Sequence, residues 1–574
     1  MADAALDGVR LGVVRGISYG LFGKPDQFLP QLRELGAGLV RVYFYWSQVE
    51  PEPGRWSFDA VDAFLDQLDG SEEVWVTVCS SSRWATRQAT DFLPPSPAKD
   101  LEAYRRFVDR LVRHCAGRVR YWQCDNEPSN VGLLWAGTAD EYVAQLKVMY
   151  QAVKDADPDG LVVLGGAPFG LPESPPDSPD RQFFDVLLRD GRHAFDLFDL
   201  HLYGEAGRIP ADIETARGLM RAFGYEKPLV AGEYNAPWPN LYPEAVQAMQ
   251  AALAAAFAAG PDVSADPGPG ARQTPEQAAM ASLYERLPSL PPQLQMFMRG
   301  CPPELEAKRH RINCREIVMR NLLALASGVR RTICWNLAPE IPGYENRLSV
   351  MDLLFGKLAL LDYEGTELTR RHPAADTFAL VAGQLAGVDS VVRIEAPGRP
   401  SLYLFEVRRR GRGPLLVVWD QRDPFTGEDD PPAAFDWPWP EARAAAVDAF
   451  GQAQPAQVRD GRVHPGGLRH PAAGHRRLTP AASATTVPAT RSWGGRREPT
   501  NSMATSTTIA ALATPSSTAS RAAARSPGQT SRFHTAVWAS SQGIVNFTAV
   551  RSSDRGQATR SPSVVRTRRP RSRL

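Results

Sequence analysis

The fold of this chain is decided by the stretch YWQCDNEP, residues 121–128. Its apolar first half is typical of a short buried strand. Pro128 ends that strand because proline cannot donate to a sheet ladder and restricts the backbone of the residue before it. The strand therefore delivers Asn126 and Glu127 to its carboxyl end. A second stretch, PLVAGEY at residues 228–234, has the same design and ends near Glu233. In an α/β barrel, strand carboxyl ends gather at one face, so we expect the two glutamates to share a cleft.

Strand-like and helix-like segments alternate along most of the chain. The strand-like segments are 13–19, 38–44, 73–79, 119–124, 161–166, 195–203, 229–233 and 329–335. Strands separated by helices imply parallel pairing through right-handed crossovers. Eight such units predict an α/β fold, a closed (β/α)8 TIM barrel. A doubly wound open sheet is the alternative, and it is disfavoured because no glycine-rich phosphate loop follows the first strand.

The sequence divides into three regions. Residues 1–385 are predicted to form the barrel, with an insertion at about 236–305 that contains two helices and is interpreted as a lid over the cleft. Residues 386–463 are predicted to form a small β module, because 401–407 and 414–419 resemble the two strands of a hairpin. Residues 464–574 are rich in Ser, Thr, Ala, Pro and Arg. Such a segment buries too little apolar surface to fold, so a disordered tail is expected.

The formal net charge of +1 conceals an asymmetry between body and tail. From Gly461 onward there are 18 Arg, no Lys and two acidic residues, which leaves 47 basic and 62 acidic residues before it. An acidic body argues against nucleic acid as the main partner. Because a basic arm without any Lys is unusual, one hypothesis is that the reading frame slips near 460–463 and the tail is read out of frame. A nucleic-acid-binding arm is the alternative.

Cysteine spacing and hydropathy exclude several classes of protein. None of the six cysteines forms a C-x-x-C pair, so we expect buried free thiols and no metal site. No apolar run reaches the roughly 18 residues that a membrane span requires, and the N-terminus lacks the basic and apolar regions of a signal peptide. We therefore expect a soluble, cytoplasmic protein with no membrane partner. The sequence leaves the oligomeric state open.

The strand-end motifs resemble those of the retaining glycoside hydrolases of clan A. The residues that carry the resemblance are Asn126-Glu127-Pro128 after the fourth strand, Gly232-Glu233 after the seventh, Leu39-Val40-Arg41 with Trp46 in the second-strand passage, His201-Leu202-Tyr203 in the sixth strand and Trp335 closing the eighth. The pattern is closest to family 39, which includes β-xylosidases and α-L-iduronidases, although families 5 and 42 share most of it. It spans about residues 10–385.

The resemblance implies a division of labour between the two glutamates. Glu233 would be the nucleophile that forms a covalent glycosyl-enzyme, and Glu127 would be the acid/base; the residues alone do not order them. A retaining pair lies roughly 5–5.5 Å apart, and its environment must separate the two pKa values. Arg41, if it points to the barrel top, would keep Glu233 ionised. The implied substrate is an oligosaccharide or other glycoside, and no metal or organic cofactor is implied.

Seven residues are predicted to bind substrate. They are Asn126, Arg41, His201, Tyr203, Trp335, Trp46 and Trp84. Asn126 would donate to the sugar 2-hydroxyl, and the tryptophans would offer flat apolar faces to sugar rings. Each has a purely structural alternative: a turn asparagine, an arginine in an ion pair, a histidine satisfied within its strand, or a tryptophan in the core.

Two other functions fit the same scaffold. A carbohydrate-binding pseudoenzyme would hold sugar without cutting it, but loss of activity usually removes a carboxylate and both glutamates are intact. A transglycosylase would use the same residues and differ only in the acceptor, so the sequence does not separate it from a hydrolase.

Overall fold

The computed structural model describes residues 6–259, 274–339, 347–364, 367–413, 415–430, 435–439, 441–465 and 472–475. Eight parallel strands close into a barrel in chain order. The strands are β1 (Arg10–Val14), β2 (Leu39–Tyr45), β3 (Glu73–Cys79), β4 (Tyr121–Cys124), β5 (Leu161–Ala167), β6 (Leu197–Leu202), β7 (Leu229–Tyr234) and β8 (Arg331–Cys334). Strand β1 pairs with both β2 and β8, which closes the ring. The predicted (β/α)8 fold is confirmed.

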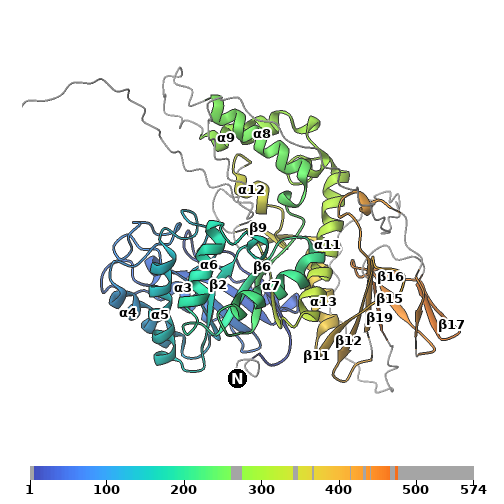
Figure 1. Ribbon diagram of the computed structural model, residues 1–574, viewed down its shortest axis with the longest axis horizontal. Coiled ribbons are helices and arrows are strands. Elements are labelled where there is room, and N and C mark those ends of the chain that lie inside the picture. Colours follow the sequence, from blue (N-terminus) through green and yellow to red (C-terminus); the bar gives the residue numbers. More distant parts are fainter. Residues whose placement is uncertain are drawn as a thin grey trace, which may run out of the picture.

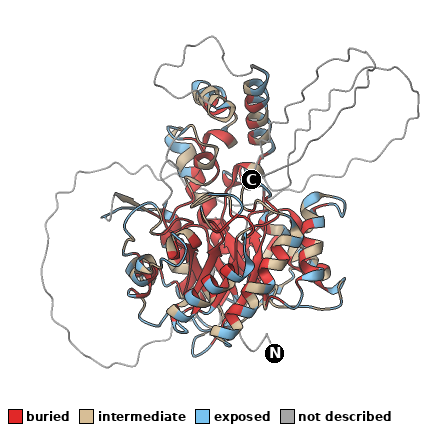
Figure 2. Cartoon of the chain, turned by 90° about the vertical axis from the view of Figure 1, so that its left-hand side faces the viewer, coloured by how far each residue is buried: buried red, intermediate tan, exposed pale blue. Residues whose placement is uncertain are grey.

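Helices surround the barrel, and the most buried residues lie at its centre (Figure 2). The helices around the strands are α1 (Leu29–Glu34), α2 (Trp46–Val49), α3 (Asp59–Leu65), α4 (Leu101–Cys115), α5 (Ala139–Ala156), α6 (Pro179–Asp190), α7 (Ile209–Arg221), α11 (Pro303–Ala326) and α13 (Pro373–Leu385). Helix α4 illustrates how the sequence sets these elements. The Asp100 side chain caps its first turn by accepting from the N–H of Glu102, and Ala116 ends it in the left-handed region.

Two elements differ from the sequence prediction. The first strand ends at Val14 instead of continuing through residue 19, because Gly16 adopts a φ of 113° that takes the chain out of the sheet. Helix α6 was not predicted between the fifth and sixth strands. Ser178 caps it, and Pro179 occupies its first position, so its start signal was present in the sequence.

The insertion stands over one end of the barrel as a separate group of helices (Figure 1). It contains α8 (Pro243–Ala259), α9 (Pro275–Glu285) and the short α10 (Pro292–Gln295). Below it lies α12 (Val350–Phe355), which follows β8 in the chain. Arg299 Nη2 donates to Asp352 Oδ1 at 2.6 Å, and the N–H of Val350 donates to Glu276 Oε1 at 3.1 Å. The insertion therefore holds α12 in position.

The C-terminal part contains small antiparallel sheets. One sheet consists of β11 (Val388–Ile394), β12 (Leu402–Arg409), β13 (Leu415–Asp420), β15 (Ala445–Val447), β16 (Ala453–Gln454) and β19 (Ala472–His475). A second sheet consists of β14 (Trp437–Pro438), β17 (Ala456–Arg459) and β18 (Arg462–Pro465). A separate hairpin consists of β9 (Leu361–Glu364) and β10 (Glu367–Arg371). The predicted hairpin corresponds to β12 and β13, which pair from Leu402 opposite Asp420. Strand β19 lies within the predicted tail of residues 464–574; apart from 464–465 and 472–475, that tail lies outside the described residues.

All six cysteines are free thiols, and five of them are buried. Among the described residues, no helix is both long enough and apolar enough to cross a membrane.

Trp46 belongs to the core between the barrel and its helices, which corrects its assignment as a sugar contact. Its side chain is fully buried and stacks on Phe107 with ring centroids 5.0 Å apart. Its indole Nε1 donates to Glu50 Oε2 at 2.9 Å. Both ring faces and the polar atom are thus occupied by protein.

We expect Trp46→Ala to lower the free energy of unfolding by about 3–5 kcal/mol, because it removes a large, fully packed side chain. Urea unfolding measures this loss, with Trp84→Ala as the control. Trp84 is only half-buried and should cost clearly less. Equal stability of Trp46→Ala and the wild type, together with weaker sugar binding, would contradict the core assignment.

Candidate active site

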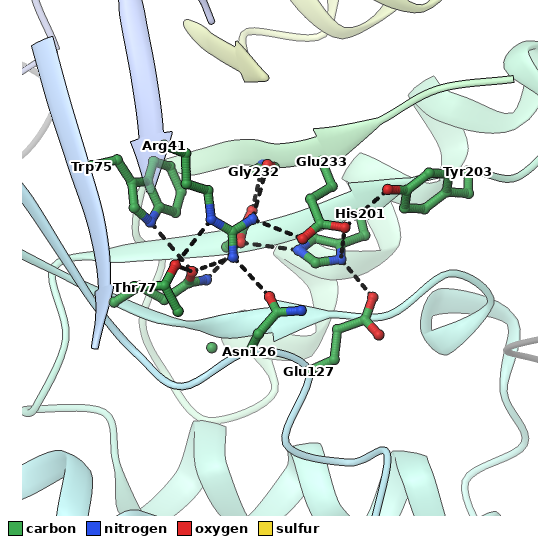
Figure 3. A network of polar contacts seen from close by, with 12 residues as sticks. Arg41, Trp75, Thr77, Asn126, Glu127, His201, Tyr203, Gly232 and Glu233 are labelled. Atoms are coloured by element: carbon green, nitrogen blue, oxygen red, sulfur yellow. Dashed lines mark hydrogen bonds and ion pairs between the residues drawn. The ribbon is translucent and has the colours of Figure 1, made fainter. Parts of the chain in front are cut away.

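The side chains of Glu127, His201 and Glu233 converge at the carboxyl ends of β4, β6 and β7, and the side chain of Arg41 reaches them from within β2 (Figure 3). One oxygen of Glu127, one nitrogen of His201 and one oxygen of Glu233 all lie within 4.8 Å of one another. All three side chains are buried. The two predicted strand-end glutamates therefore face each other across one site.

The turn after β4 aims Glu127 into this site. Asp125 and Glu127 have φ values of 48° and 40°, a left-handed conformation that is costly for residues other than glycine. The turn is held by the buried Asp125 carboxylate, which accepts from the Ser80 N–H at 2.8 Å and the Ser80 hydroxyl at 2.6 Å. Burial raises the pKa of Asp125 to about 7, although Ser80 opposes the rise. Asn130 Nδ2 then donates to Glu127 Oε2 at 2.5 Å.

Arg41 is fully buried and holds several strands together through one guanidinium group. Nη1 donates to Glu233 Oε1 and to the Gly232 carbonyl, both at 3.0 Å. Nη2 donates to Gln123 Oε1 at 2.5 Å and to Asn126 Oδ1 at 2.8 Å, and Nε donates to Thr77 Oγ1 at 3.1 Å. Because Asn126 Oδ1 is engaged by Arg41, the amide NH₂ group of Asn126 is the part that can serve a ligand in the cleft.

The Glu233 carboxylate accepts from three side chains. Besides Arg41, the Tyr43 hydroxyl donates to Oε1 at 3.0 Å and the Tyr203 hydroxyl donates to Oε2 at 2.9 Å. Burial raises the pKa of both tyrosines, so they keep their protons and remain donors. Burial also raises the pKa of Glu233, while His201 and Arg41 act in the opposite direction. Three donors to one carboxyl group favour its ionised form.

His201 lies among three carboxyl groups. Its Nδ1 is 2.5 Å from Glu127 Oε1 and 3.4 Å from Glu233 Oε2, and its Nε2 is 3.3 Å from Asp199 Oδ2. Burial alone would lower the pKa of His201, but Glu233, Asp199 and Glu127 outweigh burial and raise it to about 10. Conversely, burial would raise the pKa of Asp199, but His201 and Arg41 hold it below its ordinary value. His201 is thus an imidazolium near neutral pH.

A cavity of about 80 Å³ opens beside the two glutamates. Trp335 and Trp238 line it together with Asn126 and Tyr203. Trp84 does not line it: its indole Nε1 donates to the Glu50 carbonyl at 2.9 Å, and its ring lies edge-on to Trp46. Like Trp46, Trp84 therefore packs against protein and does not make the predicted sugar contact in this cavity.

Sequence reasoning missed several residues that shape the site. Tyr43 is two residues after Arg41, and Asp199 is two residues before His201, so each shares its strand face with a predicted residue. This alternation along the strand is evidence in the sequence that both residues face the site. Gln123 donates from Nε2 to Asp199 Oδ2 at 2.7 Å. Its position as a polar residue in an otherwise apolar strand is weaker evidence of the same kind. Asn130 follows β4 in a loop, where no periodicity could reveal its contact with Glu127.

The grouping of Glu127, His201 and Glu233 has a geometry that could hold a metal ion. The Nδ1 of His201 is already 2.5 Å from Glu127 Oε1, a contact that a metal ion on these ligands would have to break. The expected absence of a metal stays a prediction.

The raised pKa of His201 makes stability depend on pH. Since its folded-state value of about 10 exceeds the ordinary value near 6.5, the stabilisation is fully present below about pH 6.5 and is lost as pH rises through about 10. We expect His201→Gln to be destabilised most at about pH 6, with a smaller difference from the wild type at about pH 10. Urea unfolding across this range measures it.

The exposed His193 supplies the matched control. His193→Gln should show no comparable change with pH. A constant difference in unfolding free energy between His201→Gln and the wild type, from about pH 6 to about pH 10, would show that His201 is not held as an imidazolium.

Comparison with known proteins supports the fold. No family model matches the sequence, and no curated protein matches it. A family 39 glycoside hydrolase from Bacteroides cellulosilyticus WH2 is similar in structure with a TM-score of 0.52 and 14% identity, covering 82% of each chain. A glucosidase from Croceicoccus marinus has a TM-score of 0.50 and 15% identity, covering 82% of this chain and 95% of that one. The structural neighbours of this chain therefore include glycoside hydrolases, among them one of family 39, and they share its barrel fold.

Proposed function

We propose that this protein is a retaining glycoside hydrolase. The observation that carries the proposal is the approach of Glu127 and Glu233 at the ends of β4 and β7, where one oxygen of each carboxyl group lies within 4.8 Å of the other. Inverting enzymes need room for a water between their carboxyl groups, at separations of roughly 6.5–9.5 Å, whereas retaining pairs lie at about 5–5.5 Å. The close pair favours double displacement.

Glu233 is proposed as the nucleophile. Its carboxylate attacks the anomeric carbon while the bond from that carbon to the leaving oxygen breaks, and Glu127 transfers its proton to the leaving oxygen. In the second step, Glu127 takes a proton from water as the water oxygen attacks the anomeric carbon. Glu233 is then released as a carboxylate. The three donors to Glu233 support this order of roles, because they favour an unprotonated group.

The distribution of buried charge supports the role of Glu233. Two buried cations, Arg41 and His201, face three carboxyl groups, those of Glu127, Asp199 and Glu233. Glu233 is near both cations, with Arg41 at 3.0 Å and His201 at 3.4 Å, whereas His201 is the one cation that Glu127 contacts. The ion pair with Arg41 therefore distinguishes Glu233 as the carboxylate that attacks the anomeric carbon.

The sugar bound beside Glu233 would meet two tryptophan rings and the Asn126 amide. Trp238 and Trp335 line the cavity and offer apolar ring surface to a sugar. The NH₂ group of Asn126 is proposed to donate to the hydroxyl next to the anomeric carbon. His201 and Arg41 act through the glutamates as positioning residues.

We expect Glu233→Gln to lower kcat by about 1000-fold or more on a 4-nitrophenyl glycoside that the wild type cleaves. Glu127→Ala should lose about 100-fold or more on glycosides with poor leaving groups. It should lose less on 4-nitrophenyl glycosides, which need no protonation. Added azide should restore turnover of Glu127→Ala and give a glycosyl azide of retained configuration. Glu52→Gln, an exposed carboxylate outside the cleft, is the control.

Proton NMR of the first-formed sugar distinguishes the outcomes. Retained configuration supports the proposal, and inverted configuration contradicts it. Binding of glycosides without turnover would identify a carbohydrate-binding pseudoenzyme, and transfer of the glycosyl group to an added sugar in preference to water would identify a transglycosylase.

A further inference from the structure

Polar and apolar side chains are segregated around the cavity. The polar groups gather near Glu233, where Tyr43 and Tyr203 donate to its carboxylate. Much of the remaining lining consists of half-buried apolar side chains, which we call the apolar collar. Its members are Leu93, Leu133, Leu134, Phe169, Met351 and Phe355. Among the described lining residues, none with an ionisable carboxyl, amino or guanidinium group exists besides the two glutamates.

The apolar collar is assembled from four separate segments. Leu93 follows β3, Leu133 and Leu134 follow β4, Phe169 follows β5, and Met351 and Phe355 lie on α12. Two hydrogen bonds from the insertion hold α12 in place: Asp352 accepts from Arg299, and the Val350 N–H donates to Glu276. Figure 1 shows α12 between the barrel and the helices α8 and α9. The insertion thus contributes to the cleft through α12, and between Trp238 and the end of α10 no described residue lines the cavity.

The position of Leu133 and Leu134 relative to Glu127 indicates what this part of the collar contacts. In the proposed reaction, Glu127 protonates the leaving oxygen, so the leaving group lies on its side of the cleft. Leu133 and Leu134 belong to the loop that carries Glu127. Both of their N–H groups donate to the carbonyl of Asn130, and the side chain of Asn130 donates to Glu127. A sugar placed against these side chains would bury hydroxyl groups without hydrogen-bond partners, which is unfavourable. An apolar leaving group would instead remove collar surface from water.

We propose that the leaving group of the natural substrate is a hydrophobic alcohol or phenol instead of a second sugar. This inference rests on the proposed glycoside hydrolase function and adds the class of aglycone. The bond that breaks joins the anomeric carbon to the aglycone oxygen, which receives the Glu127 proton. The products are a free sugar and a hydrophobic hydroxyl compound. An aliphatic chain and an aromatic ring would satisfy the collar equally, and the experiment separates these two sources.

The experiment compares glycosides of one sugar with different leaving groups. A panel of 4-nitrophenyl glycosides first identifies the sugar that the wild type releases. The methyl, n-octyl and benzyl glycosides of that sugar, and its disaccharide, are then compared by kcat/KM. An alkyl or benzyl alcohol is no better a leaving group than a sugar hydroxyl, so faster cleavage of the octyl or benzyl glycoside reports binding. We expect the octyl glycoside, or the benzyl glycoside if the aglycone is aromatic, to exceed the disaccharide by at least about tenfold.

Substitutions in the collar connect this preference to the structure. Met351→Gln and Leu133→Asn change apolar side chains to polar ones of similar size. Each should lower the ratio of kcat/KM for the octyl glycoside to that for the methyl glycoside by about fivefold or more. Val392→Gln is the matched control, because Val392 is an apolar residue that is 51% exposed on β11, away from the cleft. Its ratio should equal that of the wild type.

The outcomes of this inference and of the proposed function can be told apart. Cleavage of the disaccharide at a rate equal to or above that of the octyl and benzyl glycosides, with activity still dependent on Glu233, would overturn the aglycone assignment and leave the hydrolase proposal standing. An unchanged ratio in Met351→Gln and Leu133→Asn would also overturn it. Failure to cleave any glycoside would remove the proposed function, and this inference with it.

Discussion

The site depends on one buried cation. The Arg41 guanidinium donates to acceptors that reach it from β3, β4 and β7, and no water is needed to satisfy it. Placing a charge in a barrel core is unfavourable unless it is paired and fully hydrogen-bonded. The ion pair with Glu233 and the four further hydrogen bonds meet that requirement. They also fix the orientation of the Glu233 carboxylate and of the Asn126 amide, so the cost of burial is linked to the geometry of the site.

A second cation, His201, extends this network to the other glutamate. It contacts Glu127 and Asp199 with opposite ring nitrogens and lies near Glu233. Asp199 in turn accepts from the Gly232 N–H at 2.5 Å and from Gln123 at 2.7 Å. Both glutamates are therefore oriented by cations that are themselves held by neighbouring strands. This linkage explains why the two carboxyl groups can remain close although like charges repel.

The sequence was sufficient for the strands and for the main acidic pair. Apolar runs that stop at Asn126-Glu127-Pro128 and at Gly232-Glu233 mark strand ends, and strand ends of a closed parallel barrel must meet. The pairing of Arg41 with an acidic group could also be predicted, because a charge inside a β-branched strand needs a buried partner. Trp46 and Trp84 could not be placed, because packing decides whether an aromatic ring faces the cleft or the core. The apolar collar could not be predicted either, since its six members come from four loops or helices that only the fold brings together.

The central claim is that Glu233 attacks the anomeric carbon while Glu127 serves the leaving group. Incubation with an activated 2-fluoro glycoside, followed by peptide mass mapping, tests it most directly because the fluorine slows release of the glycosyl-enzyme. The account predicts a single sugar label on the peptide that contains Glu233, with loss of activity in proportion to labelling. A label on Glu127 would contradict the account. So would an enzyme that cleaves the parent glycoside but is neither inactivated nor labelled by its 2-fluoro analogue.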